Sequence, residues 1–578
     1  MNLGRLWRTV GHLTPGQVGW RLIHEARLAT YRRAGNLPAL WWRPDAQARF
    51  VGSALDATPF AAERAVAELW RAGEVSYLGR RGRRDDWQAL DQVKLWRYER
   101  QYHRELVALA ALAQVEPDGP WLADATTLVA TWAAACPPAR GDAWEPYPVA
   151  RRILSWSLAG CLVPMLGARL AAQLAPQLRF LDRHLERHLL GNHLLCDATA
   201  LVAGAAVLEA AGAAHIGERA LTLLTRELQK QVLADGGYGE RTMQYHSIVA
   251  QDAMIALGLW RRRGREVPEA ALEVVRRMLA FVARVRRADG SLPWLNDAAP
   301  DATPPPAQLF ALAHALGLGE LLPATDAARE DVTLADTGWQ IVRRDGDELL
   351  FDCGPLGPDE QPGHGHSDTL GFELIWQGQP IVLDSGVTTY QADDIRAFER
   401  SALAHAVLTV AGRGADELWA AFRVGARGSV IPGAREREGA LRRLHGTLTS
   451  PSGWTHARTI VYEPARAFVV VDRVRGAASG DCRLRLPLAP GVALVGERLE
   501  SAAGSLGWTV LCGRVVAVEQ GSIGAGFGQR QPRSVIAIEP DADGRAIYGI
   551  FAPGVALARI AEGARLSGGG PDILVELG

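Results

Sequence analysis

Three side chains that could bind a metal ion lie in the second half of the chain. His366 lies in the segment GHGHSDTLGFELIWQGQPIVLDSG (residues 363–386), Asp384 lies near its end, and His405 ends the segment RSALAH. The separations of 18 and 21 residues suit ligands carried by successive strands or loops. Neutral imidazoles and a carboxylate suit zinc, with water or another group as the fourth ligand. Ordinary hydrogen-bonded loop histidines would give the same pattern, and the sequence leaves both interpretations open.

A glycine-rich loop delivers four further polar side chains. In DGGYGERTMQYHSIVAQDAMIAL (residues 235–257) the loop is followed by Glu240, Arg241, Tyr245 and His246 at the start of a predicted helix. Arg241 and Tyr245 are four residues apart and are expected to share a helical face, from which His246 is rotated by about 100°. A cation beside a phenol could bind a carboxylate and move a proton. The alternative is a packed tyrosine and a solvated arginine.

Asn192 and His193 stand where another helix is expected to begin. They follow a glycine in the segment LLGNHLLCDATALV, and an apolar run comes after them. Asparagine is a favoured N-cap residue, so the pattern predicts Asn192 as the cap and His193 in the first turn. A capping role and a binding role both remain open on the sequence alone.

The elements that must position these residues change in type near residue 330. Up to that point apolar residues recur at helical spacing, as in YPVARRILSWSLAGCLVPML, whereas β-branched runs such as ARTIVYEPARAFVVVDRV follow residue 336. Asp345-Gly346, between QIVRR and ELLFD, predicts a hairpin. We therefore expect an all-helical domain followed by an antiparallel β-sandwich-like domain. Successive helical hairpins could close into a toroid, although periodicity alone does not show closure.

Composition limits the classes of protein that remain. A chain of 578 residues with 48% hydrophobic residues is expected to form two or more domains with substantial cores. The formal charge of −1 argues against nucleic acid or an anionic membrane as the main partner. The six cysteines lack CxxC spacing, so we expect buried thiols. We find no membrane span, and residues 200–214 are interpreted as a buried helix.

The first twenty residues, MNLGRLWRTVGHLTPGQVGW, lack the uninterrupted apolar core of a secretory signal. A cytoplasmic location is therefore expected, and a periplasmic one would fit if the N-terminus has been processed. The sequence makes no prediction of the oligomeric state.

Five segments, in this order, resemble the heparinase II/III family of polysaccharide lyases. They are GNHLL, GGYGERTMQYH, GHGHSDTLGFEL, IVLDSG and RSALAH, of which the GHGHSD stretch is the most specific. The resemblance extends from about residue 180 to 430. It implies an incomplete (α/α) toroid with an N-terminal helical extension over residues 1–330, and an antiparallel β-sandwich domain over residues 331–578. It also implies an enzyme that cleaves a uronic-acid-containing polymer by β-elimination.

The resemblance further implies roles for single residues. Asn192 would face the uronate carboxylate, Tyr245 would transfer a proton, and His364 would be its partner. The implied zinc ligands are His366, Asp384 and His405, and we expect contacts to the substrate from His193, Glu240, Arg241 and His246. Family members often read AHNT where this chain reads AHAV, which leaves apolar residues beside His405.

The chemistry of elimination explains the need for such groups. Removal of the C5 proton places negative charge on the adjacent carboxylate, which a donor such as Asn192 must stabilise, while an acid protonates the departing O4. On this interpretation His364 faces the cleft and His366 the metal. Side chains two residues apart on a strand share a face, so the glycine-rich segment is expected to be an irregular loop.

Substrate and reaction class have alternatives. The polymer could be glycosaminoglycan-like or a bacterial exopolysaccharide. A glycoside hydrolase is a second possibility, with Glu240 and Asp297 as the two carboxylates that such enzymes need. A third is a non-catalytic glycan-binding or assembly protein that uses its 18 tryptophans as stacking platforms.

Overall fold

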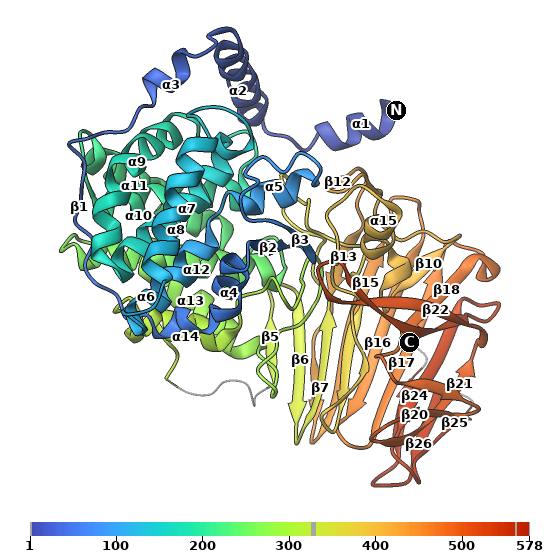
Figure 1. The fold of residues 1–578 in the computed structure, drawn as a ribbon. Helices are drawn as coiled ribbons and strands as arrows, with labels where there is room; N and C mark the ends of the chain where they lie inside the picture. Colours follow the sequence, from blue (N-terminus) through green and yellow to red (C-terminus); the bar gives the residue numbers. More distant parts are fainter. Residues whose placement is uncertain (1–2, 325–330, 561–562, 577–578) are drawn as a thin grey trace.

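Helices form the first part of the chain and strands the second (Figure 1). The structure is a computed structural model that describes residues 3–324, 331–560 and 563–576. The α-helices are α1 (Leu3–Val10), α2 (Pro15–Arg33), α3 (Leu37–Trp41), α4 (Arg64–Arg71), α5 (Lys94–Arg100), α6 (Arg104–Val115), α7 (Trp121–Ala135), α8 (Pro146–Leu162), α9 (Pro164–Arg183), α10 (Gly191–Val207), α11 (Ala213–Gln231), α12 (Met243–Arg262), α13 (Glu269–Val285), α14 (Pro306–Ala315) and α15 (Asp394–Arg400). Short 3-10 helices include η1 (Thr58–Glu63) and η3 (Gly319–Leu321).

Helix α10 lies at the centre of the helical part. It packs against α8, α11 and α12, and nearly all of its residues are buried. Small residues in ALVAGAAV allow this close approach, since a Cβ on Gly204 would lie 2.9 Å from side chains of both Ile153 and Leu178. The predicted buried helix over residues 200–214 is therefore correct up to Val207, after which the chain forms the two-residue strand β4 (Leu208–Glu209) and then a turn. Within the described residues no helix is long and apolar enough to cross a membrane.

Antiparallel sheets make up the second part. A five-stranded sheet contains β5 (Val332–Leu334), β6 (Trp339–Arg344), β7 (Asp347–Asp352), β8 (Phe372–Trp376) and β9 (Gln379–Val382), in that order. The predicted hairpin is confirmed, because Asp345 and Gly346 connect β6 to β7 with positive φ angles of 51° and 92°.

Three further sheets follow. The nine-stranded sheet contains β13 (Ser429–Pro432), β14 (Glu436–Glu438), β15 (Leu441–Thr449), β16 (Thr455–Glu463), β17 (Ala467–Arg475), β19 (Ala493–Val495), β20 (Arg498–Ser501), β21 (Gly504–Cys512) and β24 (Arg545–Phe551). The four-stranded sheet contains β10 (Leu408–Val410), β18 (Cys482–Pro487), β22 (Arg514–Gly526) and β23 (Gln529–Glu539), and the three-stranded sheet contains β25 (Ala556–Ile560), β26 (Gly563–Ser567) and β27 (Ile573–Glu576). Two-stranded pairs are formed by β2 (Glu74–Tyr77) with β3 (Arg80–Arg83), by β11 (Leu418–Trp419) with β12 (Arg423–Val424), and by β1 (Arg49–Phe50) with β4.

The five-stranded sheet is shared between two hydrophobic cores. Trp339 and Ile341 of β6 belong to the cluster built by the helices, whereas Val342 of the same strand belongs to the cluster built by the sheets. Side chains on a strand alternate between faces, so one face of this sheet closes the helical core and the other packs on strands. The helical part is consequently incomplete without β5–β7.

The expected boundary between residues 330 and 331 is adjacent to residues 325–330, which lie outside the described residues. On its N-terminal side η3 ends at Leu321, and on its C-terminal side β5 begins at Val332. The division into domains 1–330 and 331–578 stays a prediction. The expectation of buried thiols is confirmed, because all six cysteines are free and buried.

The shared sheet gives a stability prediction. Ile341→Ala removes buried apolar volume where β6 meets the helices, so the free energy of unfolding should fall by about 2–5 kcal/mol. Ile431→Ala is the matched control, because Ile431 is 70% exposed and its truncation should change stability by less than about 0.5 kcal/mol. Urea unfolding of both variants measures the difference, and equal stabilities would contradict a shared core.

Candidate functional site

Asn192, Tyr245 and His364 meet where the helices face the five-stranded sheet. Asn192 lies in the first turn of α10, Tyr245 in the first turn of α12, and His364 in the segment that connects β7 to β8. The amide nitrogen of Asn192 is 3.4 Å from Nε2 of His364, and the ring of Tyr245 stacks on the imidazole with centroids 3.9 Å apart. Three side chains far apart in the sequence therefore form one group between the two parts of the chain.

Unusual backbone conformations direct the two helix starts to this point. Leu190 and Gly191 both have positive φ angles, of 62° and 54°, immediately before the side chain of Asn192. A Cβ on Gly191 would lie 2.8 Å from the carboxylate of Glu240, so only glycine allows this approach. Helix α10 begins at Gly191 with Leu190 as its N-cap residue. The prediction of Asn192 as the N-cap is therefore wrong, while His193 does lie in the first turn.

Glu240 is the immediate neighbour of Asn192. Its carboxylate is buried and accepts from the Asn192 side-chain amide at 3.3 Å and from the hydroxyl of Tyr238 at 3.2 Å. Its second oxygen lies 3.7 Å from Nε2 of His364. Glu240 thus fixes the orientation of the Asn192 amide.

Arg241 does not share a helical face with Tyr245, contrary to the sequence-based expectation. It precedes α12, and its positive φ of 55° turns the side chain away from the helix. The guanidinium donates to the backbone oxygens of Thr337, Gly239 and Asp336, each at 3.1 Å. Arg241 therefore ties the glycine-rich loop to the segment before β6 and is not the cation beside the phenol.

His246 is also engaged by backbone groups. Its Nδ1 accepts from the backbone N–H of Tyr238 at 3.2 Å, and its Nε2 lies 3.1 Å from the oxygen of Met278. Burial lowers the pKa of His246 to about 4, so the ring is neutral and its two nitrogens are both used. The expectation that His246 contacts substrate is contradicted, because no ring nitrogen is left for a ligand.

His193 keeps a partly exposed position beside the group. Its Nδ1 pairs with Glu186 at 2.9 Å, and its ring packs on Tyr147 with centroids 4.7 Å apart. Burial opposes protonation, but the carboxylate of Glu186 outweighs it and raises the pKa of His193. This position is compatible with the substrate contact expected from the sequence.

Asp297 organises both histidines of the GHGH segment. His364 Nδ1 lies 2.7 Å from one of its oxygens, His366 Nε2 lies 2.8 Å from the other, and Arg396 bonds to both. Asp297 is fully buried, and burial acts to raise its pKa, yet Arg396 and the two histidines hold that pKa well below its usual value. A carboxylate that is ionised at neutral pH therefore sets the orientation of both imidazoles.

Sequence reasoning missed this role of Asp297 and two of its neighbours. The sequence suggests Asp297 only as a hydrolase carboxylate, and it does not single out Arg396 or Tyr390. Tyr245 donates to the hydroxyl of Tyr390 at 3.4 Å, and burial, with Tyr390 and Asp297 nearby, raises the pKa of Tyr245 well above its ordinary value. The one available signal was the Trp-Leu-Asn-Asp break after a helical segment, since such polar breaks between elements often carry functional residues.

The irregular loop required by the two histidines is confirmed. Residues 353–371 contain no strand, and the backbone N–H of His366 donates to the side chain of Asn296 at 2.8 Å. The loop allows His364 to face Tyr245 while His366 turns toward His405, whose ring lies 5.3 Å away between centroids.

The three predicted metal ligands come together. His366, Asp384 and His405 are buried, and each offers a ligand atom within 4.8 Å of the others. His366 uses one ring nitrogen on Asp297, and His405 uses one on Asp384 at 2.7 Å, while the second nitrogen of each ring has no partner. Burial lowers the pKa of His366 to about 4, so its free nitrogen carries a lone pair. Imidazoles oriented by carboxylates in this way suit a divalent metal such as zinc.

Polar support at this cluster comes from Asp384 rather than from the residues after His405. Ala406 and Val407 are buried, and the backbone oxygen of Ala406 accepts from Arg458 at 2.6 Å. Burial opposes ionisation of Asp384, but His405 and His366 outweigh it and lower the pKa of that carboxyl. The apolar AHAV sequence is thus compatible with an oriented His405.

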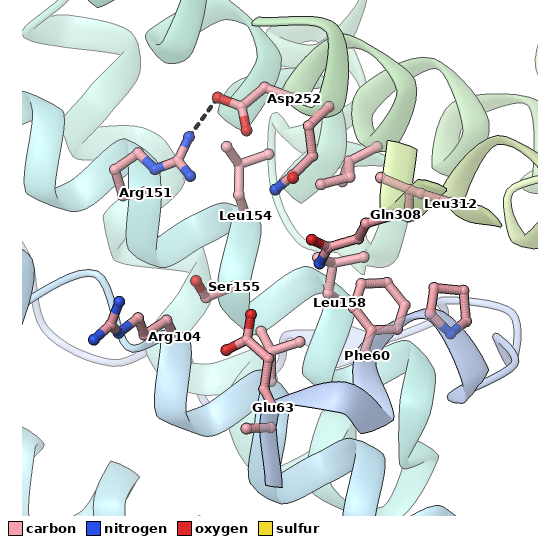
Figure 2. Close-up of a pocket in the computed structure, with 15 residues that line it drawn as sticks. Phe60, Glu63, Arg104, Arg151, Leu154, Ser155, Leu158, Asp252, Gln308 and Leu312 are labelled. Carbon is pink, nitrogen blue, oxygen red and sulfur yellow. Dashed lines mark hydrogen bonds and ion pairs between the residues drawn. The ribbon is translucent and has the colours of Figure 1, made fainter. Parts of the chain in front are cut away.

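A cavity of about 110 Å³ lies among η1, α6, α8, α12 and α14. Figure 2 shows the carboxylates of Asp252 and Glu63 on opposite sides of it, with Arg151 paired to Asp252. Burial raises the pKa of Glu63, and it raises that of Asp252 even though Arg151 opposes the shift. The lining residues are separate from those around His364, so this cavity is not part of the same site.

Two family descriptions match the chain. Residues 130–308 match the heparinase II/III N-terminus, and residues 326–561 match the heparinase II/III-like C-terminal region. The chain belongs to the heparinase II/III family.

A heparin-sulfate lyase of Pedobacter heparinus is 23% identical over 325 residues, which cover 50% of this chain and 45% of that protein. A heparin-sulfate lyase of Bacteroides stercoris is 23% identical over 326 residues, which cover 52% and 46%. This heparinase II/III family member thus spans about half the length of the curated relatives it matches.

Solved structures share the fold of this family member. A crystal structure of heparinase III covers 97% of both chains with a TM-score of 0.71 at 18% identity. A heparan sulfate lyase from Pedobacter heparinus covers 89% of both chains with a TM-score of 0.61 at 18% identity. A helical N-terminal part followed by C-terminal antiparallel sheets is therefore the architecture of these relatives as well.

The buried carboxylate gives a testable prediction. Asp297→Asn leaves the Arg396 guanidinium buried without a charge partner, so the free energy of unfolding should fall by about 3–5 kcal/mol near pH 7. The pKa of Asp297 is lower in the folded protein than in the unfolded chain. This stabilisation is therefore complete at pH values above the ordinary pKa of aspartate, and it is lost as the pH falls from there toward the depressed pKa of Asp297. Urea unfolding near pH 7 measures the loss.

Asp345→Asn serves as the control for this experiment. Its side chain is 87% exposed at the tip of the β6–β7 hairpin, and asparagine tolerates the positive φ found there. The control should remain within about 0.5 kcal/mol of the parent protein. A similarly small effect of Asp297→Asn would show that the buried network does not depend on this charge.

Proposed function

We propose that the protein is a polysaccharide lyase that cleaves a uronic-acid-containing polymer by β-elimination. The observation that carries the proposal is the stacked pair of Tyr245 and His364, with the Asn192 amide in hydrogen-bonding range of the same imidazole. These groups supply a phenol, an oriented imidazole and an amide donor at one point between the helices and the sheets.

Asn192 is proposed to stabilise the charge that develops on the substrate carboxylate. Loss of the C5 proton spreads negative charge onto that carboxylate, and an oriented amide donor lowers the barrier because its dipole is already in place. The amide currently donates to Glu240, so substrate binding must exchange or share this partner. Glu240 then serves as the group that holds the Asn192 amide in its orientation.

His364 is proposed as the base. Its Nδ1 is bonded to the ionised Asp297, which favours the tautomer with the proton on Nδ1 and a lone pair on Nε2. After the Nε2 atom accepts the C5 proton, the same carboxylate stabilises the resulting imidazolium, as in other carboxylate–histidine pairs. Nε2 is also the nitrogen that faces Asn192.

Tyr245 is proposed as the acid that protonates the departing O4. Burial, Tyr390 and Asp297 raise its pKa well above the ordinary value, so the phenol is protonated at neutral pH. A neutral phenol can donate its proton as the glycosidic bond breaks, and its stacking on His364 places acid and base side by side.

The proposed substrate is an acidic polysaccharide of the glycosaminoglycan or exopolysaccharide kind. Its support is that two curated relatives are named heparin-sulfate lyases, each matched over about half of its length. The finer description of the fold is part of the same proposal: an incomplete (α/α) toroid over residues 1–330 and a β-sandwich domain over residues 331–578.

The hydrolase alternative is less well supported. Asp297 already accepts from three side chains and stays ionised, so it is unsuited to protonate a leaving group or to activate water. The cavity among η1, α6, α8, α12 and α14 offers Glu63 and Asp252, but Asp252 is held in an ion pair with Arg151, and this cavity shares no lining residue with the group around His364. A glycan-binding role that uses tryptophans as stacking platforms also fits poorly. Among the described residues the exposed tryptophans are Trp7, Trp20 and Trp41, and all three lie in α1–α3 and not around His364.

The role of Tyr245 is tested by Tyr245→Phe. The variant keeps the ring that stacks on His364 but removes the proton donor, so turnover should fall at least about 100-fold while substrate binding changes little. The assay follows the ultraviolet absorbance of the unsaturated product over a panel of uronate-containing polymers.

Tyr462→Phe is the matched control for Tyr245→Phe. Its buried hydroxyl bonds to Asp347 at 3.1 Å in the sheet region, so the change should cost about 1–3 kcal/mol of stability and leave turnover intact. Normal turnover in Tyr245→Phe on a cleaved polymer would remove this residue from the mechanism. New reducing ends without the absorbance would indicate hydrolysis instead.

A zinc ion is proposed to bind His366, Asp384 and His405. The support is the pair of unpartnered buried ring nitrogens and the acidic residue beside them. Zinc bound at this position would crosslink the loop before β8, the end of β9 and the segment before β10. Such a ligand stabilises the folded state because the unfolded chain has no preformed site.

The metal proposal predicts about one equivalent of zinc in the purified protein. In the parent protein a chelator should lower the melting temperature. The His405→Ala variant should bind no zinc, and a chelator should leave its melting temperature unchanged. His215→Ala, at an exposed position on α11, should leave both unchanged. Elemental analysis and thermal melting provide the measurements. The site would be refuted if zinc added to the metal-free parent protein did not raise its melting temperature.

A further inference from the structure

Helices α1–α3 turn large apolar side chains toward solvent. Twenty large apolar residues are exposed in the described part of the chain, and half of them lie between residues 7 and 41. These ten are Trp7, Val10, Leu13, Val18, Trp20, Leu22, Ile23, Leu37, Leu40 and Trp41. Figure 1 shows the three helices along one outer edge of the molecule. Clustering of this kind marks an interaction surface.

The inner face of helix α2 makes polar and ring contacts with the protein, and its outer face is apolar. On the inner face His24 stacks on His188 with centroids 4.5 Å apart, and the hydroxyl of Tyr31 bonds to His184 at 2.7 Å. The outer face carries a stripe of apolar residues at helical spacing: Val18, Leu22, Ile23 and Ala26. An ordinary surface helix buries its apolar stripe, whereas here these four side chains face solvent.

Helix α1 repeats the arrangement. Arg5 and Arg8 pair with Glu417, and Thr9 accepts from the indole N–H of Trp419. On the other side of the helix Trp7 is 74% exposed. Polar contacts therefore hold α1 on the protein while its largest apolar side chain faces outward.

The same segment is strongly basic. Residues 3–43 contain seven arginines and one acidic residue, Glu25, although the whole chain has 63 basic and 64 acidic residues. The positive charge is thus local and is concealed in the overall value of −1. An anionic partner is the electrostatic complement of this surface.

We propose that α1–α3 form a docking surface for a lipid bilayer with anionic headgroups. Tryptophan, leucine and isoleucine on one side with arginines around them is the composition of helices that lie in the membrane interface. Arginines attract the anionic headgroups while the apolar side chains enter the acyl boundary. The helices would lie on the bilayer and not cross it.

Other occupants fit the surface less well. An acidic polysaccharide would engage the arginines but leave the leucine and isoleucine side chains unused. A second copy in a symmetric dimer would bring the same arginine-rich surface against itself, which like charges oppose. A bilayer satisfies the apolar and the basic groups together.

The docking surface adjoins the proposed active site. Glu417, which holds α1, precedes the β11–β12 hairpin, and Phe422 within this hairpin packs edge-on against His364 with centroids 5.7 Å apart. Gln17 at the start of α2 also donates to the backbone oxygen of Glu360, in the loop that carries His364. Bound in this way, the enzyme would present its site close to the membrane surface.

Vesicle flotation of the full-length chain tests the proposal. The protein should float with phosphatidylcholine vesicles containing about one third phosphatidylglycerol, bind phosphatidylcholine alone weakly, and lose binding as salt rises. Leu22→Glu, on the outer face of α2, should lower the bound fraction at constant lipid by at least about 10-fold in partition coefficient. Leu90→Glu is the control, because Leu90 is 79% exposed outside this surface and its replacement should leave binding unchanged.

Several outcomes would overturn the proposal. The proposal fails if the parent protein does not float with the vesicles, or if the Leu22→Glu variant floats as well as the parent. A dimer that Leu22→Glu dissociates, seen by light scattering in the absence of vesicle binding, would assign the surface to a second copy. Binding of heparin but not of vesicles would assign it to an acidic polymer. Thermal melting of each variant verifies that the fold is retained.

Discussion

The structure of the site depends on one buried carboxylate. Asp297 receives His364, His366 and Arg396, and it has no contact with solvent. A charge in this environment is stable only because a cation and two further donors surround it. The same bonds fix which nitrogen of each imidazole is free, so a single residue determines the base proposed for catalysis and one of the proposed metal ligands.

The remaining framework serves to bring other elements to this carboxylate. Positive φ angles before α10 and near the start of α12 direct two helix starts toward it, and the loop after β7 arrives from the opposite side. The sheet that carries this loop also closes the helical core. The helical and the sheet parts are therefore joined by packing as well as by the polar network, and a site between them needs both.

Charge and apolar surface have to be judged locally in this protein. The near-zero net charge argued against an anionic surface as a partner, yet the first three helices concentrate arginines beside exposed tryptophan and leucine. The average conceals the patch because acidic residues elsewhere balance it. Exposure could be recognised only from the structure, since an apolar stripe at helical spacing normally indicates burial.

Local sequence patterns determined much of this protein. Helical periodicity, β-branched runs and Asp345-Gly346 were enough for the order of elements, because these signals depend on residues near in sequence. The sequence and the family resemblance named His366, Asp384 and His405 as candidate ligands, and the structure brings the three side chains together. Tertiary structure alone decided that Asp297 orients both histidines, that Arg241 binds backbone oxygens, and that His246 faces the core. The physical reason is that burial and hydrogen-bond partners come from distant segments, and a single residue's direction depends on backbone angles that its neighbours in sequence do not fix.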